Sequence, residues 1–184
     1  MKIRENLDIL IDKHPHSETL NKKLILESDD LVDSLSLPNS YYSNIQGKKK
    51  NLTSDKNSSS RLVLEWVKNL ILNRYHHRSH PTEKIRYSGV AWFAEYNKGN
   101  SCREHNHIPF ALFSFVYFVN TPPGSSPLVF ATSGKRIKAE AGKVIIFSSK
   151  MMHYVPKNKC EKRLVLAGNL LPISIDEKVS KIYL

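Results

Sequence analysis

Cysteine is scarce in this chain, which has two, Cys102 and Cys160, among its 184 residues. Two cysteines are too few for the disulfide framework of a small secreted domain. Neither belongs to a CxxC or CxH pattern, so a zinc site built on thiolates is not favoured either. We expect two reduced thiols, as is usual in cytoplasm.

Long hydrophobic runs are also missing. The longest apolar-rich stretch, Ile108 to Val119, is interrupted by Pro109 and Ser114, whereas a membrane-spanning helix needs roughly 18 apolar residues or more. Residues 1–6 contain neither an apolar core nor a small-residue cleavage site, so we expect no signal peptide. With 40% apolar residues and a mean hydropathy of −0.40, the composition indicates a soluble globular protein with no membrane partner.

Acidic residues are few in the second part of the chain. Residues 1–60 hold nine basic and nine acidic side chains, so the whole excess of the net charge of +11 lies in residues 61–184. Such an excess can attract nucleic acid, an acidic protein or small anions. No nucleic-acid-binding motif accompanies it, so a solvated basic surface remains the simpler interpretation.

Two amphipathic patterns in the first half of the chain predict helices. Apolar residues recur at helical spacing over residues 17–36 and again over residues 61–75. Ser17 and Ser60 stand where N-caps are expected. Residues 6–11 read as a short strand.

The polar stretch of residues 46–60 (QGKKKNLTSDKNSSS) is typical of a flexible loop. It separates an N-terminal helical segment, residues 1–60, from a main body, residues 61–184. The length still favours one domain over residues 1–184, since domains of roughly 100–200 residues are common. There is no internal repeat.

From residue 85 onward the sequence is rich in aromatic and β-branched residues, which favour strands. Short runs bounded by turn residues predict strands at 85–96, 102–107, 110–119, 128–131, 136–139, 143–147 and 163–167. The pattern predicts a mainly β protein with supporting α-helices, a jelly-roll barrel preceded by N-terminal helices. Most aromatic residues of its third strand are expected in the core: Phe110, Phe113, Phe115, Tyr117 and Phe118.

Four residues carry the most specific chemical signal. His105-x-His107 places two imidazoles on one face of a predicted strand, because side chains alternate along a strand. His153, from a distant segment, could complete a set of three nitrogen ligands around one metal ion. Arg163 follows ten residues later as a fixed cation that could pair with an anionic cosubstrate. The other histidines, His14, His16, His76, His77 and His80, lie in polar contexts and read as surface residues.

The order of these motifs resembles the iron(II)/2-oxoglutarate-dependent dioxygenases, and among them the small prolyl-hydroxylase-like branch common in phage and bacterial genomes. The resemblance covers roughly residues 87–170. Tyr96-x-x-Gly99 before His105-x-His107 is similar to the opening motif of the family, and Leu128-Val129-Phe130 to its L-x-F strand. Gly142-x-x-x-x-Phe147, then His153 and Arg163, is similar to its closing motif.

The resemblance implies a double-stranded β-helix of the cupin-like class and a hydroxylase that uses Fe(II), 2-oxoglutarate and O2. His105, His107 and His153 would bind the iron, and Arg163 would pair with the far carboxylate of 2-oxoglutarate. Tyr96 and Asn169 would lie in the cosubstrate pocket. Succinate and CO2 would be co-products, and the location would be cytoplasmic, in the host cytoplasm if a phage encodes the chain.

The primary substrate is left open by the resemblance, as a protein side chain or a small molecule. Arg86, Ser88 and Trp92 share a strand face with Tyr96 and are candidates to line the mouth of the pocket. One departure concerns the metal site, since most of the superfamily has a carboxylate where this chain has His107. Glu104 is the alternative carboxylate, but on a regular strand it faces away from the site.

Two other functions compete with the oxygenase. Gly99 and His105-x-His107 also fit the first motif of cupins that do not use 2-oxoglutarate, although the expected glutamate is absent and His153 lies too far after Gly142 for the second motif. The third candidate is a non-catalytic metal-binding protein of the same fold, with a basic surface for nucleic acid. The gap between Gly142 and His153 favours the oxygenase.

Overall fold

The computed structural model describes residues 9–31, 46–50, 58–76 and 85–174. The described residues form ten strands, two α-helices and one π-helical turn. In chain order these are β1 (Ile9–Lys13), α1 (Ser17–Asp30), β2 (Gln46–Lys50), α2 (Ser59–Ile71), η1 (Leu72–His76), β3 (Ile85–Tyr96), β4 (Cys102–His105), β5 (Phe113–Asn120), β6 (Leu128–Phe130), β7 (Arg136–Ile137), β8 (Lys143–Ser148), β9 (His153–Val155) and β10 (Arg163–Ser174).

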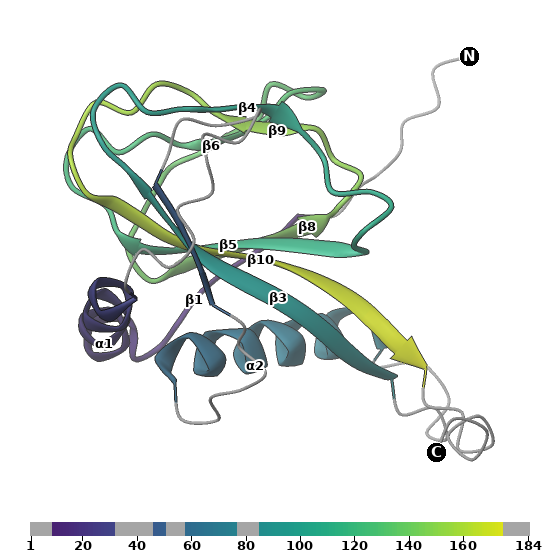
Figure 1. The fold of residues 1–184 in the computed structure, drawn as a ribbon. Helices are drawn as coiled ribbons and strands as arrows, with labels where there is room; N and C mark the ends of the chain where they lie inside the picture. Colours follow the sequence, from purple (N-terminus) through teal and green to yellow (C-terminus); the bar gives the residue numbers. More distant parts are fainter. Residues whose placement is uncertain (1–8, 32–45, 51–57, 77–84, 175–184) are drawn as a thin grey trace.

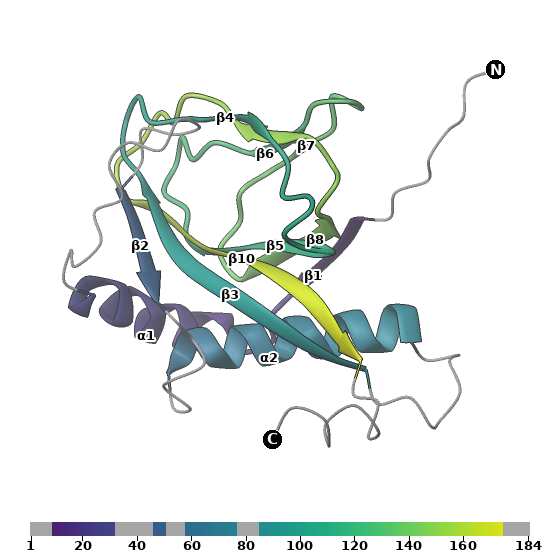
Figure 2. The same cartoon turned by 45° about the vertical axis from the view of Figure 1, so that its right-hand side comes forward.

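The strands make two sheets that face each other (Figures 1 and 2). The major sheet has the order β1-β8-β5-β10-β3-β2, and the minor sheet has the order β4-β9-β6-β7. Neighbouring strands are antiparallel throughout. This is the double-stranded jelly roll with helical support that the strand pattern predicts, so the predicted fold class is confirmed.

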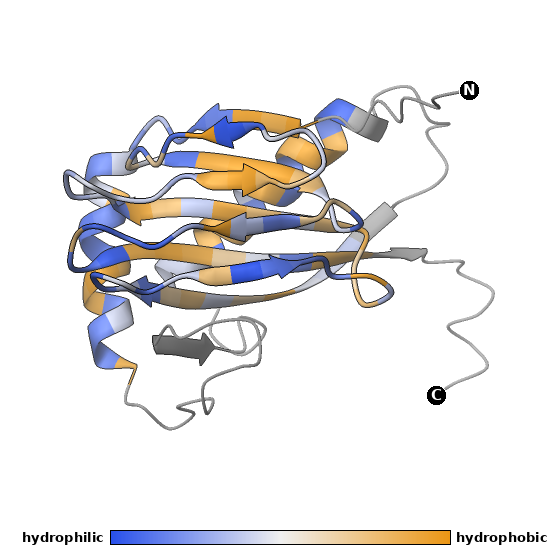
Figure 3. Cartoon of the chain, turned by 90° about the horizontal axis from the view of Figure 1, so that it is seen from above, coloured by the Kyte–Doolittle hydropathy of each residue, from blue (hydrophilic) through white to orange (hydrophobic). Residues whose placement is uncertain are grey.

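Both helices pack on the outer face of the major sheet, away from the minor sheet (Figure 2). Buried side chains of α1 and α2, such as Leu24 and Val67, contact Phe93, Phe115 and Leu166 of the sheet. The inner face of the same strands carries Ala94, Phe118 and Val165, which belong to a second core between the sheets. The major sheet is therefore apolar on both faces, and in Figure 3 the strands carry most of the hydrophobic colour.

The helix starts differ from the predicted caps. Helix α1 begins at Ser17, and its N-cap residue is His16, without a side-chain hydrogen bond. In α2 the cap is Ser58, whose Oγ accepts from the backbone N of Arg61. Ser60 lies inside the helix, fully buried, and hydrogen-bonds through its backbone N and Oγ to Glu27 of α1. The serine singled out as a cap instead joins the two helices.

Part of the predicted flexible loop is a strand. Residues 46–50 form β2, which pairs antiparallel with residues 91–95 of β3 at the edge of the major sheet. Residues 51–57 of that loop lie outside the described residues. An edge strand can be polar throughout and needs no alternating apolar pattern, so the composition concealed it.

Several strand boundaries also differ from those predicted. The strand predicted from residue 110 begins at Phe113, and Phe110 lies before it with 77% of its surface exposed, so its assignment to the core was wrong. Strand β9 was not predicted, because three residues are too short for a periodic signal. Strand β10 continues seven residues past the predicted end at 167, pairing with β3 along its whole length.

No helix among the described residues has the length and apolar content needed to cross a membrane.

Candidate metal centre

A cavity of about 680 Å³ lies between the two sheets. Its walls come from the inner face of β3, β5 and β10 and from β4, β6, β8 and β9. The residues that line it include Val90, Trp92, Tyr96, Cys102, Glu104, His105, Asn106, His107, Ile108, Phe110, Ser114, Phe147, His153, Arg163 and Asn169.

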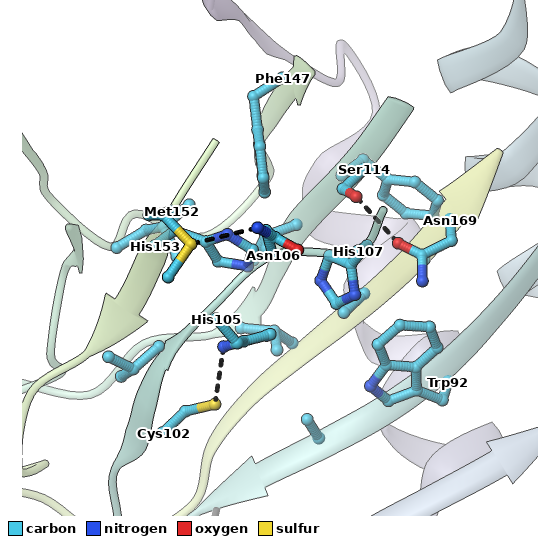
Figure 4. A pocket seen from close by; sticks show the side chains of 18 of the residues that line it. Trp92, Cys102, His105, Asn106, His107, Ser114, Phe147, Met152, His153 and Asn169 are labelled. Atoms are coloured by element: carbon cyan, nitrogen blue, oxygen red, sulfur yellow. Dashed lines mark hydrogen bonds between the residues drawn. The ribbon is translucent and has the colours of Figure 1, made fainter. Parts of the chain in front are cut away.

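Three histidines converge in this cavity (Figure 4). His105 ends β4 and pairs with His153, which begins β9, as direct partners across the minor sheet. The ring centroids of His105 and His153 lie 4.4 Å apart, and those of His107 and His153 lie 5.1 Å apart. One potential ligand atom from each of the three lies within 4.8 Å of the other two. This spacing suits a single ion held by three imidazole nitrogens.

His107 reaches the site by a different route from the one expected. The predicted strand 102–107 ends at His105, so His107 lies beyond it and does not share its face by alternation. Pairing between β4 and β9 shifts register between Cys102 and His105. The backbone N of His107 donates to the carbonyl of Ser149 at 2.9 Å, which holds His107 beside β8. Its ring still lies beside the other two, with its centroid 4.9 Å from that of His105.

Backbone carbonyls set which ring nitrogen faces the cavity in two of the histidines. Nδ1 of His105 lies 2.8 Å from the carbonyl of Arg103, and Nδ1 of His153 lies 2.9 Å from the carbonyl of Met151. Since a carbonyl only accepts, each Nδ1 carries the proton and each Nε2 is left as a lone-pair donor. Such second contacts orient the imidazole ligands of metal sites.

Burial keeps His107 and His153 neutral. Together with the smaller effect of the neighbouring His105, it lowers the pKa of His153 to about 3 and that of His107 to about 4. A metal ion needs the neutral form, because the proton and the ion compete for the same lone pair. At pH 7 both rings are therefore in the form that binds metal.

Arg163 is the largest fully buried side chain among the described residues. Its Nε donates to the carbonyl of Ser126 at 3.0 Å, and its guanidinium carbon lies 4.5 Å from the centre of the Tyr96 ring. The two terminal nitrogens, Nη1 and Nη2, are buried with no hydrogen-bond partner among the described residues. Burial lowers the pKa of Arg163, and the nearby Tyr96 partly opposes the effect. Unpaired buried donors on a cation are costly, so this geometry calls for an anion in the cavity.

A frame of loop residues holds Arg163 from behind. Asn158 is buried, and its Oδ1 accepts from the backbone N of Ser126 at 2.9 Å. Its Nδ2 donates to the carbonyl of Tyr96 at 2.9 Å and to that of Cys160 at 2.8 Å. One side chain thus ties together the loop that accepts from Arg163 and the strand end that carries Tyr96. Sequence reasoning missed Asn158, since nothing in its surroundings marks it.

The two secondary candidates occupy different parts of the cavity. Tyr96 is the direct partner of Arg163 across β3 and β10, and burial raises the pKa of its phenol far above its usual value. Asn169 lies within β10, not in the turn that would end the predicted strand. Its Oδ1 accepts from the hydroxyl of Ser114 at 2.9 Å. Arg163, Val165 and Asn169 line the same cavity, as strand alternation predicts.

Other candidate residues lie further from the metal ligands. Glu104 is exposed and borders the cavity, but it is not part of the histidine cluster. Trp92 lines the cavity with its ring 6.4 Å from that of His107, whereas Ser88 is exposed and does not line it. Cys102 lines it as a thiol, since burial raises its pKa to about 11. The side chain of Arg86 lies outside the described residues.

The remaining histidines are mostly untested. His14 is half-buried, with its ring 4.8 Å from that of Trp66, so it is not the surface residue expected. His16 is exposed, as predicted. The side chain of His76, and all of His77 and His80, lie outside the described residues.

No family model and no curated protein sequence matches the chain. Solved structures do. The viral collagen prolyl hydroxylase of Paramecium bursaria Chlorella virus-1, in complex with 2-oxoglutarate, matches with a TM-score of 0.65 and 13% identity, over 88% of this chain and 94% of its own. A prolyl-4-hydroxylase of Pseudomonas putida matches with a TM-score of 0.65 and 17% identity, over 90% and 92%.

A prolyl hydroxylase of Trichoplax adhaerens, in complex with a peptide of hypoxia inducible factor, matches with a TM-score of 0.62 and 12% identity, over 96% of this chain and 87% of its own. At such low identity the match concerns the fold. The resemblance drawn from the sequence motifs is confirmed at that level: this chain has the double-stranded β-helix fold of solved prolyl hydroxylases.

Proposed function

We propose that the chain is a non-haem Fe(II)- and 2-oxoglutarate-dependent oxygenase that hydroxylates a C–H bond of a protein side chain or a small molecule. One observation carries the proposal: the two unpartnered terminal nitrogens of Arg163 are buried at the cavity that also holds the three clustered histidines. A cation binder and an anion binder thus share one cavity. Among solved proteins of this fold, one is described in complex with 2-oxoglutarate.

The donor set fits a divalent iron ion. His105, His107 and His153 offer three neutral nitrogens, and imidazole is a ligand that suits iron. Because no carboxylate belongs to the cluster, the full charge of the ion would remain in the cavity. That charge favours a cosubstrate that brings negative charge of its own.

The surroundings of Arg163 fit one end of a dicarboxylate. The two terminal nitrogens form a planar fork that matches a carboxylate with two parallel hydrogen bonds. Tyr96 packs on the guanidinium from β3, and Ser126 fixes its Nε from the loop before β6. The frame leaves the fork no freedom to swing away, so the anion would be oriented as well as bound.

With iron and 2-oxoglutarate bound, the site would supply oxidising chemistry that consumes O2, yields succinate and CO2, and hydroxylates the substrate. The residues of this chain would hold and orient the iron and the cosubstrate and would limit the access of water to them. Phe147 packs edge-on against His153 with ring centroids 4.8 Å apart, and Trp92 borders His107. These aromatic walls restrict water around the ligands.

The decisive experiment replaces Arg163 with methionine, which keeps most of the volume and removes the fork. Calorimetric titration of 2-oxoglutarate into anaerobic, Fe(II)-loaded protein should show a loss of affinity of about 100-fold or more, since charge-assisted hydrogen bonds contribute about 1.5–3 kcal/mol each. Metal affinity should stay the same, because Arg163 is not part of the histidine cluster.

The matched control is Arg136→Met, at an exposed arginine of β7 outside the cavity, which should bind 2-oxoglutarate like the parent protein. Normal cosubstrate binding by Arg163→Met would refute the role of the arginine. Failure of the parent protein to bind 2-oxoglutarate at all would refute the oxygenase. A cupin-like enzyme without 2-oxoglutarate is less favoured, because it leaves the buried fork of Arg163 without an anion.

A further inference from the structure

A chain of hydrogen bonds runs through the wall of the cavity and ends at Asn169. The hydroxyls of Ser149 and Ser114 lie 2.7 Å apart, and the hydroxyl of Ser114 lies 2.9 Å from Oδ1 of Asn169. Ser149 is fully buried and Ser114 nearly so. Ser149 lies in the turn directly after β8, Ser114 in β5 and Asn169 in β10, so these hydrogen bonds link three neighbouring strands.

The donor-to-acceptor direction of these hydrogen bonds follows from the buried hydroxyl of Ser149. Among the described residues, its single side-chain partner is Ser114, and a buried hydroxyl needs an acceptor for its proton. Ser149 therefore donates to Ser114, and Ser114 donates to Asn169. The reverse direction would leave the Ser149 proton buried without an acceptor. Consequently the carboxamide of Asn169 turns its oxygen to the wall and its nitrogen away from it.

The nitrogen of Asn169 points into the cavity. In Figure 4 the amide nitrogen lies on the side of His107 and Trp92, opposite the dashed bond to Ser114. Nδ2 donates to none of the described residues, and Asn169 lines the cavity. The wall thus presents a fixed hydrogen-bond donor close to one metal ligand.

This donor lies far along β10 from Arg163. Asn169 lies six positions after Arg163 on β10, which is about 20 Å along a strand at roughly 3.3 Å per residue. A five-carbon dicarboxylate held by Arg163 is much shorter than this span.

The rim of the cavity near Asn169 is apolar and uncharged. Val90 is the direct partner of Asn169 on β3, and the segment from His107 to Leu112 returns to β10, where the N of Leu112 donates to the carbonyl of Leu170. On this segment Ile108 is 52% exposed and Phe110 is 77% exposed, and both border the cavity. Of the described lining residues, Glu104 and Arg163 are the charged ones apart from the histidines. An uncharged acceptor on an apolar group therefore suits this end of the cavity.

Resting on the oxygenase function proposed above, we infer that Asn169 is a specificity-determining residue that binds the primary substrate rather than 2-oxoglutarate. Its Nδ2 donates to an uncharged carbonyl oxygen of that substrate, of the kind an amide presents. The apolar rim of Val90, Ile108 and Phe110 contacts the hydrocarbon part next to the carbonyl. Ser114 and Ser149 are positioning residues that fix the direction of the amide.

The test uses N-butylacetamide, a neutral amide with an apolar chain, as the probe. Its binding is followed in 15N-labelled protein, with and without Zn²⁺, by the side-chain amide signal of Asn169 and, in the variants, by the backbone amide signals of the cavity wall. The signal should shift on titration, whereas pentanoate at the same concentration should shift it much less. Asn169→Leu and Ser114→Ala should each weaken probe binding about 2- to 10-fold, as expected for one net hydrogen bond.

Asn106→Ala is the matched control, because Asn106 lines the same cavity but its amide donates to the sulfur of Met152. This variant should bind the probe like the parent protein. The 2-oxoglutarate affinity of Asn169→Leu should stay within about 2-fold of the parent, in contrast to Arg163→Met.

Three outcomes would overturn the inference. They are an unmoved Asn169 signal, equal probe binding by parent and both wall variants, or a loss of 2-oxoglutarate affinity in Asn169→Leu as large as in Arg163→Met. Failure of the parent protein to bind 2-oxoglutarate would instead count against the oxygenase, and the probe titration would still measure the donor at Asn169.

Discussion

Burial sets the protonation state of individual histidines in this cavity. His107 and His153 have folded-state pKa values of about 4 and about 3, against about 6.5 in an unfolded chain. Between these limits the unfolded chain binds more protons than the folded protein. Folding stability therefore rises with pH across this window and is fully present above about pH 6.5.

We predict that the metal-free protein loses stability as the pH falls from about 6.5 towards 4. The measurement is urea denaturation at a series of pH values in the presence of a chelator. His153→Gln should flatten this dependence, because a glutamine takes up no proton. An unchanged slope in the variant would show that His153 is not held neutral by the fold.

Single residues also show how far the sequence could be interpreted. The histidines and Arg163 could be singled out because their residue types and spacing are specific. Asn158, Ser114 and Ser149 could not, since each acts through hydrogen bonds to segments distant in the chain. The roles predicted for Tyr96 and Asn169 as cosubstrate ligands stay predictions, and for Asn169 we propose a different ligand above.

At the scale of elements, Gly142 lies where helix α1 and strands β5 and β8 meet. Gly142, in the turn before β8, accepts from the backbone N of His14 at 2.9 Å and donates to the carbonyl of Phe118 at 2.8 Å. Its φ of +85° lies in the left-handed region, and a Cβ there would collide with the side chain of Ser17, the first residue of α1. Both the turn and the docking of α1 require glycine.

Gly142→Ala and Gly134→Ala form a matched pair. Gly134 has a φ of +68° with open space around its Cα, so alanine there should cost about 1–2 kcal/mol for the backbone alone. Alanine at 142 should cost about 1–3 kcal/mol more, because Ser17 must move. Urea denaturation measures the free energy of unfolding of both variants. Equal losses of stability would show that α1 can shift away from a Cβ at position 142 without an energetic penalty.

The elements that were predicted correctly are those with a strong internal pattern. Helix α2 buries one face and its helical spacing is visible in the sequence, whereas strand β3 is marked by its aromatic and β-branched residues. Strands β2 and β9 gain their structure from pairing with a neighbour, which no local pattern records. The single-domain organisation, the cytoplasmic location and any nucleic-acid partner stay predictions.

At the scale of the whole molecule, ligands of the cavity should raise its thermal stability. A ligand that binds only the folded state adds about 2.7 kcal/mol at a concentration of 100 times its dissociation constant. For a protein of this size that corresponds to a rise in Tm of roughly 5–10 °C. We predict one such rise with a divalent metal and a further one with 2-oxoglutarate.

Differential scanning fluorimetry measures both steps. Arg163→Met should retain the step with metal and lose the step with 2-oxoglutarate, and a chelator should reverse the former. A shift with 2-oxoglutarate in the absence of any metal, equal in the variant and the parent, would point to binding elsewhere.

The histidines belong to the minor sheet and its adjoining turn, whereas Arg163 begins a strand of the major sheet. A ligand bound to the iron at one end and to the guanidinium at the other would bridge the two sheets. Separation of the two sheets and release of this ligand would then be coupled. The bound ligand would therefore contribute to the rigidity of the barrel. Fluctuations in the distance between the sheets would limit the rate at which the ligand is exchanged.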